Sequence, residues 1–246
     1  MLAVGAVGAV PAGAGPTADN AEFCDLYFEV SQLFAEAPDP DADPLDVEEF
    51  VAELANLISQ AEAVAPPEVA AQVAAAAEKL RTTGAAALED PELAAIGAVI
   101  DAYAFEACGY QTASVTATEY EFDGLPKKLE TGPTVIELTN DGEEVHEIAV
   151  ARIKGDRTIA EVVELPEHES EEAVAFVAHG LANQGDTSYV YLDLKKAGRY
   201  GAVCFIPVGT TDLAALEEED HSGGGDAEPH SAEGMLQGFK VKKAKR

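Results

Sequence analysis

Two histidines, one cysteine and one methionine in the second half of the chain could together hold a metal ion. His146 opens an apolar segment, Cys204 closes another, and His230 and Met235 stand close together before the last apolar segment. Imidazole nitrogen, thiolate and thioether are ligands that copper accepts in both its +1 and +2 states. These residue types predict a mononuclear copper site formed by His146, Cys204, His230 and Met235.

Each of these donors also has a structural interpretation, as an inert buried thiol, a core filler or a surface histidine. Further histidines compete with them. His221 lies in the acidic, glycine-rich segment 217–225. A solvated loop is its default interpretation, although its imidazole could replace His230 or bind a second ion weakly. His168 and His179 are interpreted as surface or helix-end residues.

Alternating segments rich in β-branched residues surround the donors and predict the strands that position them. These segments are 114–120, 134–140, 146–151, 188–194, 198–204 and 236–241. Asp141-Gly142 is expected to form a turn, and a helical insertion is expected from about Thr158 to His179. Many strands separated by turn signals predict an antiparallel sandwich. Its strand ends would gather the donors at one pole.

This part of the chain resembles the cupredoxin, or blue copper, family, which includes plastocyanins and azurins. The similar motifs are Asn140 with His146, the run Gly198, Tyr200 and Cys204, the run Pro229, His230, Gly234 and Met235, and the closing Gly238–Val241. The resemblance implies a Greek-key β-sandwich with one type 1 copper ion that transfers single electrons. It also implies imidazole ligands from His146 and His230, a thiolate from Cys204 and an axial sulfur from Met235. The connection between Cys204 and His230 is longer than in many family members.

The first half of the chain has a different composition and residue pattern. From Ala18 to about Tyr110 it is rich in Ala, Leu and Glu, and its apolar spacing predicts an antiparallel bundle of four helices. The expected helix starts are Asn20, Asp46 as a cap, Pro66-Pro67, and Asp90 as a cap before Pro91. The predicted fold class is therefore α+β with two domains. A helical bundle over residues 18–110 precedes a cupredoxin-like β-sandwich with a helical insertion over residues 111–246.

The cysteines suggest one disulfide and one free thiol. Cys24 and Cys108 lie at the two ends of the helical region, whereas Cys204 stands alone in the second half. We interpret Cys24 and Cys108 as a disulfide, which leaves Cys204 for the metal. Closing so long a loop stabilises a fold by roughly 4–5 kcal/mol in the chain-entropy model.

The net charge and the N-terminal segment indicate which partners are excluded and where the protein is located. The formal net charge of −31 argues against nucleic acid or an anionic membrane as a partner. Met1 to Gly15 contain only small and apolar residues, and Ala12-Gly13-Ala14 resembles a signal-peptidase site. Residues 1–17 are therefore interpreted as an export signal or its remnant. The protein is expected outside the cytoplasm, secreted, periplasmic or at the cell surface, with no transmembrane segment in the mature chain.

The expected function is one-electron transfer by an exported type 1 copper protein, with a redox partner protein. The family resemblance implies that the electron leaves through a His230 near the surface. Two alternatives remain open: extracytoplasmic copper storage or delivery, with a copper donor or acceptor as partner, and a metal-free interaction module. No common hydrolase, kinase or dinucleotide-binding motif and no His-x-His pair occurs in the chain, so an enzyme is not expected.

Overall fold

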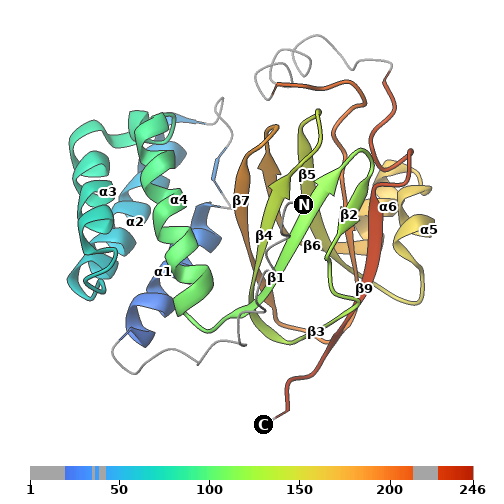
Figure 1. The fold of residues 1–246 in the computed structure, drawn as a ribbon, viewed down its shortest axis with the longest axis horizontal. Helices are drawn as coiled ribbons and strands as arrows, with labels where there is room; N and C mark the ends of the chain where they lie inside the picture. Colours follow the sequence, from blue (N-terminus) through green and yellow to red (C-terminus); the bar gives the residue numbers. More distant parts are fainter. Residues whose placement is uncertain (1–19, 35–36, 39–42, 213–226, 246) are drawn as a thin grey trace, which may run out of the picture.

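The computed structural model describes residues 20–34, 37–38, 43–212 and 227–245. The helices of the first half gather at one side of the molecule, the strands form a sandwich beside them, and the short helices of the second half lie on the far side of the sandwich (Figure 1). The expected export segment 1–17 and the competing His221 lie outside the described residues. No helix in the described ranges is long and apolar enough to cross a membrane.

The helical part confirms the expected bundle, with corrections at two helix starts. Its elements are α1 (Ala21–Phe34), α2 (Pro44–Ala63), α3 (Ala70–Thr83), the 3₁₀ turn η1 (Gly84–Ala87) and α4 (Pro91–Ala107). The prediction that Asp46 caps α2 is wrong. Pro44 is the first helical residue and the side chain of Asp43 accepts a hydrogen bond from the Leu45 amide at 2.9 Å. The third helix begins after a turn that contains Pro66-Pro67, whereas Asp90 caps α4 as predicted.

The strands form two sheets. Their bounds are β1 (Gln111–Thr118), β2 (Glu121–Asp123), β3 (Lys128–Glu130), β4 (Gly132–Asn140), β5 (His146–Ile153), β6 (Val174–Ala182), β7 (Thr187–Leu194), β8 (Gly198–Val203) and β9 (Leu236–Lys242). Within the described residues, one sheet has the order β2-β1-β4-β7 and the other the order β3-β9-β8-β5-β6. The expectation of a purely antiparallel sandwich is wrong, because β1 pairs with β4 and β3 with β9 in parallel. Asp141-Gly142 does not close a hairpin either: β4 and β5 belong to different sheets.

The helical insertion is shorter than expected. It consists of α5 (Ile159–Val163) and α6 (Glu167–Ala173), and the chain then continues as strand β6. His179 therefore lies within a strand, where it faces Ala149 of β5. Helix α5 packs closely on β8, because a Cβ atom on Gly201 would collide with the side chain of Ile159. The insertion thus covers part of the outer face of the five-stranded sheet.

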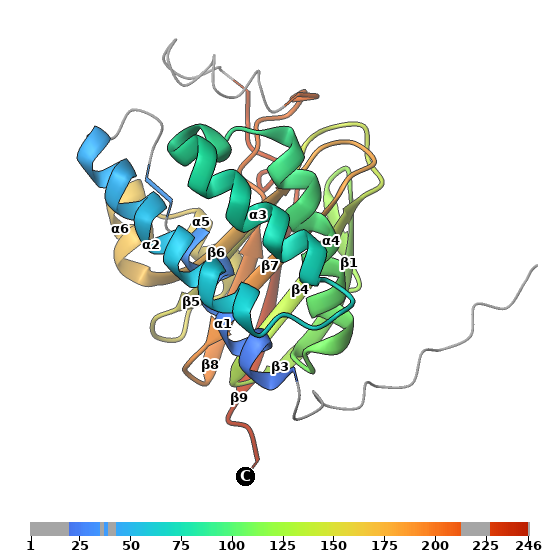
Figure 2. The same ribbon diagram turned by 90° about the vertical axis from the view of Figure 1, so that its left-hand side faces the viewer.

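The bundle covers the outer face of the four-stranded sheet. Figure 2 shows the bundle helices in front of β4 and β7. Val135 of β4 and Tyr191 of β7 are buried in the same apolar cluster as the helix residues Phe23 and Leu54. The inner faces of the two sheets form a separate core that includes Ile136, Leu138, Ile148 and Leu192. The molecule is therefore layered as bundle, first sheet, second sheet and insertion helices. The chain changes from helices to strands between Ala107 and Gln111. We propose that the domain boundary lies between residues 110 and 111.

The expected disulfide is present. Cys24 of α1 is bonded to Cys108, which follows α4, across a sequence separation of 84 residues and a Cα–Cα distance of 5.4 Å. Both cysteines are buried. The bridge therefore ties the first helix of the bundle to the point where the chain enters β1.

A carboxyl group fastens the bundle to the sandwich. Asp101 of α4 accepts hydrogen bonds from the Tyr27 hydroxyl of α1 at 2.8 Å and from the Tyr191 hydroxyl of β7 at 2.9 Å. Desolvation outweighs these hydrogen bonds and raises the pKa of Asp101 to about 6. Protonation is therefore easier in the folded state than in the unfolded chain, and this contribution to stability is lost as the pH rises from about 4 through about 6.

We expect Asp101→Asn to increase the free energy of unfolding at pH 8 by about 1–3 kcal/mol and to change it little at pH 4. The amide keeps an acceptor for both tyrosines and carries no charge that must be buried. Urea denaturation of variant and wild type, compared at each pH, measures the difference. A variant less stable than the wild type at pH 8 would contradict the prediction.

Candidate metal centre

The structure places the predicted donors at the ends of three strands of the five-stranded sheet. His146 is the first residue of β5, Cys204 follows the last residue of β8, and His230 and Met235 precede β9. In the sheet, β8 lies between β5 and β9, so these strand ends are neighbours. All four side chains are buried.

Backbone hydrogen bonds hold the two ends of the long connection between Cys204 and His230 together. The His230 amide donates to the Ile206 carbonyl at 2.8 Å, and the Ser231 amide donates to the Cys204 carbonyl at 3.0 Å. The Cys204 amide donates to the Met235 carbonyl at 3.1 Å. These contacts hold the cysteine beside the histidine. The length of the connection adds little to the cost, because loop-closure entropy grows slowly with length.

The donor atoms of His146, Cys204 and His230 converge. The Nδ1 atoms of the two imidazoles are 3.3 Å apart, and Cys204 Sγ lies 3.4 Å from His230 Nδ1. One ligand atom from each residue lies within 4.8 Å of the others. Nitrogen and sulfur ligands at tetrahedral angles around a metal with bonds of about 2.0–2.3 Å are separated by roughly 3.3–3.6 Å. The nitrogen–nitrogen and nitrogen–sulfur separations of 3.3 and 3.4 Å therefore fit two ligand pairs on a common metal ion.

The remaining imidazole nitrogens face carboxylates. His230 Nε2 is 2.9 Å from Glu144 Oε2, and His146 Nε2 is 3.6 Å from Glu119 Oε1. His146 Nε2 is buried without a hydrogen bond, so the Glu119 contact is electrostatic. A carboxylate beside Nε2 favours the tautomer with its proton there, which leaves Nδ1 free to bind a metal.

The segment before β5 is shaped by a buried amide. The side-chain NH₂ of Asn140 donates to the Glu144 carbonyl at 2.7 Å and to the Ala182 carbonyl at 2.9 Å, while its oxygen accepts from the Gly142 amide at 2.8 Å. A Cβ atom on Gly142 would collide with the Glu119 carboxylate and the His146 imidazole. Glycine at this position therefore allows His146 and Glu119 to approach each other.

Backbone amides of Glu147 and Ile206 face the thiol of Cys204. The Glu147 amide donates to Cys204 Sγ at 3.3 Å, and the Glu147 carboxylate accepts from the Phe205 amide at 3.3 Å. Desolvation by burial raises the pKa of Cys204 to about 11. Desolvation, followed by the neighbouring His230, lowers the pKa of His146. Neutral imidazoles suit metal binding, whereas the thiol must lose its proton to the solvent when a metal enters.

His230 and Met235 both lie in the interior of the sandwich. The side chain of His230 is itself fully buried. It contacts the Tyr120 ring at 4.8 Å between centroids, and Glu144 lies at its outer nitrogen, so partly exposed side chains cover it. Met235 is fully buried in the same core as Cys204, and its amide donates to the His230 carbonyl at 3.0 Å. Its backbone lies beside Cys204 and His230, and the axial role of its sulfur stays a prediction.

Sequence reasoning missed the carboxylates around the cluster. Glu119, Glu144 and Glu147 come from segments that meet only in the fold. The Glu119 carboxylate accepts from the Glu143 and Glu144 amides at 2.5 and 3.1 Å. Glu144 and Glu147 flank His146 in the sequence, which is a signal for two of the three, but Glu119 has no such signal.

No family model and no curated protein matches the chain. Among solved structures, a reduced auracyanin from Roseiflexus castenholzii is 17% identical with a TM-score of 0.33, and the match covers 55% of this chain and 98% of that one. Auracyanin A of Chloroflexus aurantiacus, described as a "blue" copper protein, has the same identity and TM-score and covers 54% and 98%. The McoA multicopper oxidase of Aquifex aeolicus is 15% identical with a TM-score of 0.31, over 55% of this chain and 30% of that one.

These similarities are weak and carry no argument about function. The description of the fold depends instead on the two-sheet order and on the buried His-Cys-His group at the strand ends. The N-terminal helical part is not recognised. The C-terminal part of the chain has the two-sheet β-sandwich fold that the resemblance to the cupredoxins predicted.

Proposed function

We propose that the protein is an extracytoplasmic type 1 copper protein that transfers single electrons. His146 and His230 supply imidazole nitrogens, Cys204 the thiolate and Met235 an axial thioether. The observation that carries the proposal is the burial of two Nδ1 atoms and one Sγ atom within bonding reach of a common centre. A copper ion in such a set alternates between its +1 and +2 states.

Hydrogen bonds within the chain make the site rigid, and the burial of its residues excludes water. Cys204 and His230 are held by neighbouring backbone segments, and Asn140 fixes the segment that leads to His146. The Glu147 amide donates to the sulfur. A rigid ligand set changes little between oxidation states, so little reorganisation accompanies electron transfer.

Burial of the site favours electron transfer over copper delivery. His146, Cys204 and His230 expose none of their surface, whereas a delivery site needs access for an incoming ligand. An oxidase role is not favoured, because the sequence has no His-x-His pair for a trinuclear copper cluster. The Cys24–Cys108 disulfide supports a location in an oxidising compartment. The proposed partner is a redox protein.

Metal analysis and an optical spectrum of the purified full-length protein test the proposal. We expect one copper ion per chain, an intense blue colour in the oxidised state and bleaching by ascorbate. Slow transfer of copper(I) to a chelator would agree with a carrier, and rapid transfer would favour delivery. A colourless protein that takes up no copper would refute both copper functions.

Glu144→Gln is expected to raise the reduction potential. The Glu144 carboxylate lies at the outer nitrogen of His230, and its negative charge stabilises the more positive oxidised centre. At an effective dielectric constant of about 20, a charge roughly 7 Å away is worth about 2 kcal/mol, and partial exposure reduces this. We expect a shift on the order of +50 mV in a spectroelectrochemical titration.

Glu143→Gln is the matched control, because Glu143 is the adjacent carboxylate and its side chain is exposed. We expect it to shift the potential much less, and more weakly still at high salt. Equal shifts in the two variants would show that net charge, not the contact with His230, sets the effect.

A further inference from the structure

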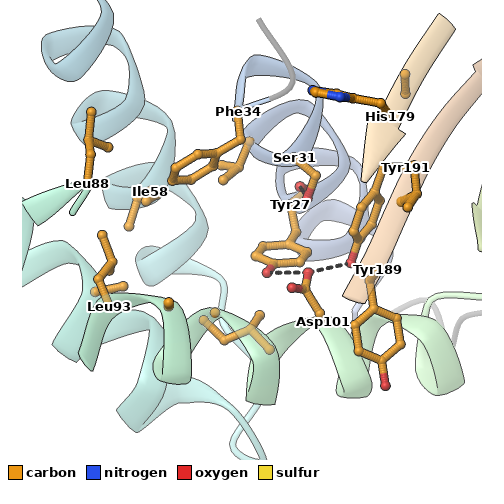
Figure 3. A pocket seen from close by; sticks show the side chains of 17 residues that line it. Tyr27, Ser31, Phe34, Ile58, Leu88, Leu93, Asp101, His179, Tyr189 and Tyr191 are labelled. Atoms are coloured by element: carbon orange, nitrogen blue, oxygen red, sulfur yellow. Dashed lines mark hydrogen bonds between the residues drawn. The ribbon is translucent and has the colours of Figure 1, made fainter. Parts of the chain in front are cut away.

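A cavity of about 380 Å³ lies between the bundle and the outer face of the four-stranded sheet. Helices α1 and α4 and strand β7 contribute most of its wall, and His179 of β6 lies at one side (Figure 3). The volume falls within the usual range for small-molecule sites. The cavity is distinct from the proposed metal ligands, none of which lines it.

Asp101 supplies a charged group to this cavity. Both tyrosine hydroxyls donate to the same oxygen, Oδ1, and among the described residues nothing hydrogen-bonds Oδ2. In Figure 3 the carboxyl group lies between the rings of Tyr27 and Tyr191. In the described part of the chain, no lysine or arginine lines the cavity. A half-buried carboxylate without a positive partner is less favourable than one in water, so a cation at Oδ2 would gain a strong contact.

The surrounding walls suit an organic cation better than a hydrated metal ion. Tyr27 and Tyr191 pack edge to face with centroids 6.0 Å apart, and Phe34 and Tyr189 add further rings. The faces of such rings attract cations. The rest of the wall is mainly aliphatic, including Ile58 and Leu93, and would contact an apolar skeleton.

We propose that this cavity binds a compact organic cation, a protonated primary amine carried on an apolar skeleton of one or two rings. The ammonium group pairs with Asp101 Oδ2, and the skeleton lies against the tyrosine rings and the aliphatic wall. The formal charge of −31 favours the approach of a cation and disfavours an anion. The bundle then has a binding role, because its helices provide one wall of the site.

Calorimetric titration of the full-length protein with 2-phenylethylammonium chloride at pH 7.5 and physiological salt tests the proposal. Titration with 2-phenylethanol, which has the same skeleton without the charge, is the ligand control. We expect one saturable site for the amine and at least tenfold weaker binding of the alcohol. Because the measurement needs no metal, its outcome is independent of the proposed copper function.

Two variants test whether the amine and the alcohol bind in this cavity. Asp101→Asn is expected to weaken amine binding at least tenfold and to leave the alcohol little affected. Gly97→Leu is expected to block both ligands, because Gly97 lines the cavity and a Cβ atom there meets nothing within 4 Å. Leucine also suits a helix better than glycine, so this variant should fold.

Three results would overturn the proposal: no saturable amine binding, equal affinity for amine and alcohol, or amine binding unchanged in both variants. The last result would assign the amine to the acidic surface. In each case Asp101 would be only a contact that fastens the bundle to the sheet.

Discussion

Cys204→Ser is expected to abolish the blue colour and to weaken copper binding by more than about 100-fold. The thiolate is the only sulfur anion in the cluster of His146, Cys204 and His230, and it is the group whose charge transfer to copper gives type 1 sites their colour. Loss of an outer hydrogen-bond partner alone typically weakens metal binding 10–100-fold, so loss of a direct ligand should exceed this. Metal analysis after gel filtration and an optical spectrum measure both effects.

Ile206→Val is a suitable control, because Ile206 is buried two residues from the cysteine but offers no ligand atom. It should lower the free energy of unfolding by about 0.5–1.5 kcal/mol and leave the colour unchanged. If the serine variant bound copper as tightly as the wild type, Cys204 would be a core residue and the metal-free interaction module would be the better function.

The donors could be found from the sequence because their chemistry is unusual for each position. A free cysteine, and a histidine and a methionine shortly before a predicted strand, are rare enough to be noticed together. The strands around them could be predicted from alternation, and six expected strands correspond to β1, β4, β5, β7, β8 and β9. What the sequence could not show is that the connection from Cys204 returns to the same strand ends, since this depends on the backbone pairing of Ile206 with His230.

Other features could not be predicted because no local sequence signal marks them. Strand β6 follows the acidic helix α6 directly, so its residues were included in the expected insertion. Glu119 acts on His146 from a segment 27 positions away, and only the fold brings the two together. The bundle and the sandwich also share a buried cluster through Val135 and Tyr191. An outward-facing tyrosine on a strand is ordinary in sequence, so the attachment of the bundle to the sheet was not foreseen.

Removal of the disulfide by Cys24→Ala together with Cys108→Ala is expected to give the largest loss of stability. The bridge closes a loop of 84 residues that contains the whole bundle. The chain-entropy model assigns such a loop about 4–5 kcal/mol, and measured losses are often smaller, so we expect about 3–4 kcal/mol. For a protein of this size the midpoint of thermal unfolding should fall by about 10 °C. Urea and thermal unfolding followed by circular dichroism measure these changes.

The same double variant separates the roles of the two halves. The bridge lies in the bundle cluster, whereas Cys204 belongs to the core between the sheets, so copper content and colour should remain those of the wild type below the unfolding transition. Because Tyr27 and Tyr191 join α1 to β7 through Asp101, loosening of α1 should also weaken amine binding. A variant as stable as the wild type within about 1 kcal/mol would show that the covalent link removes little entropy from the unfolded chain, because residual structure already restricts that chain.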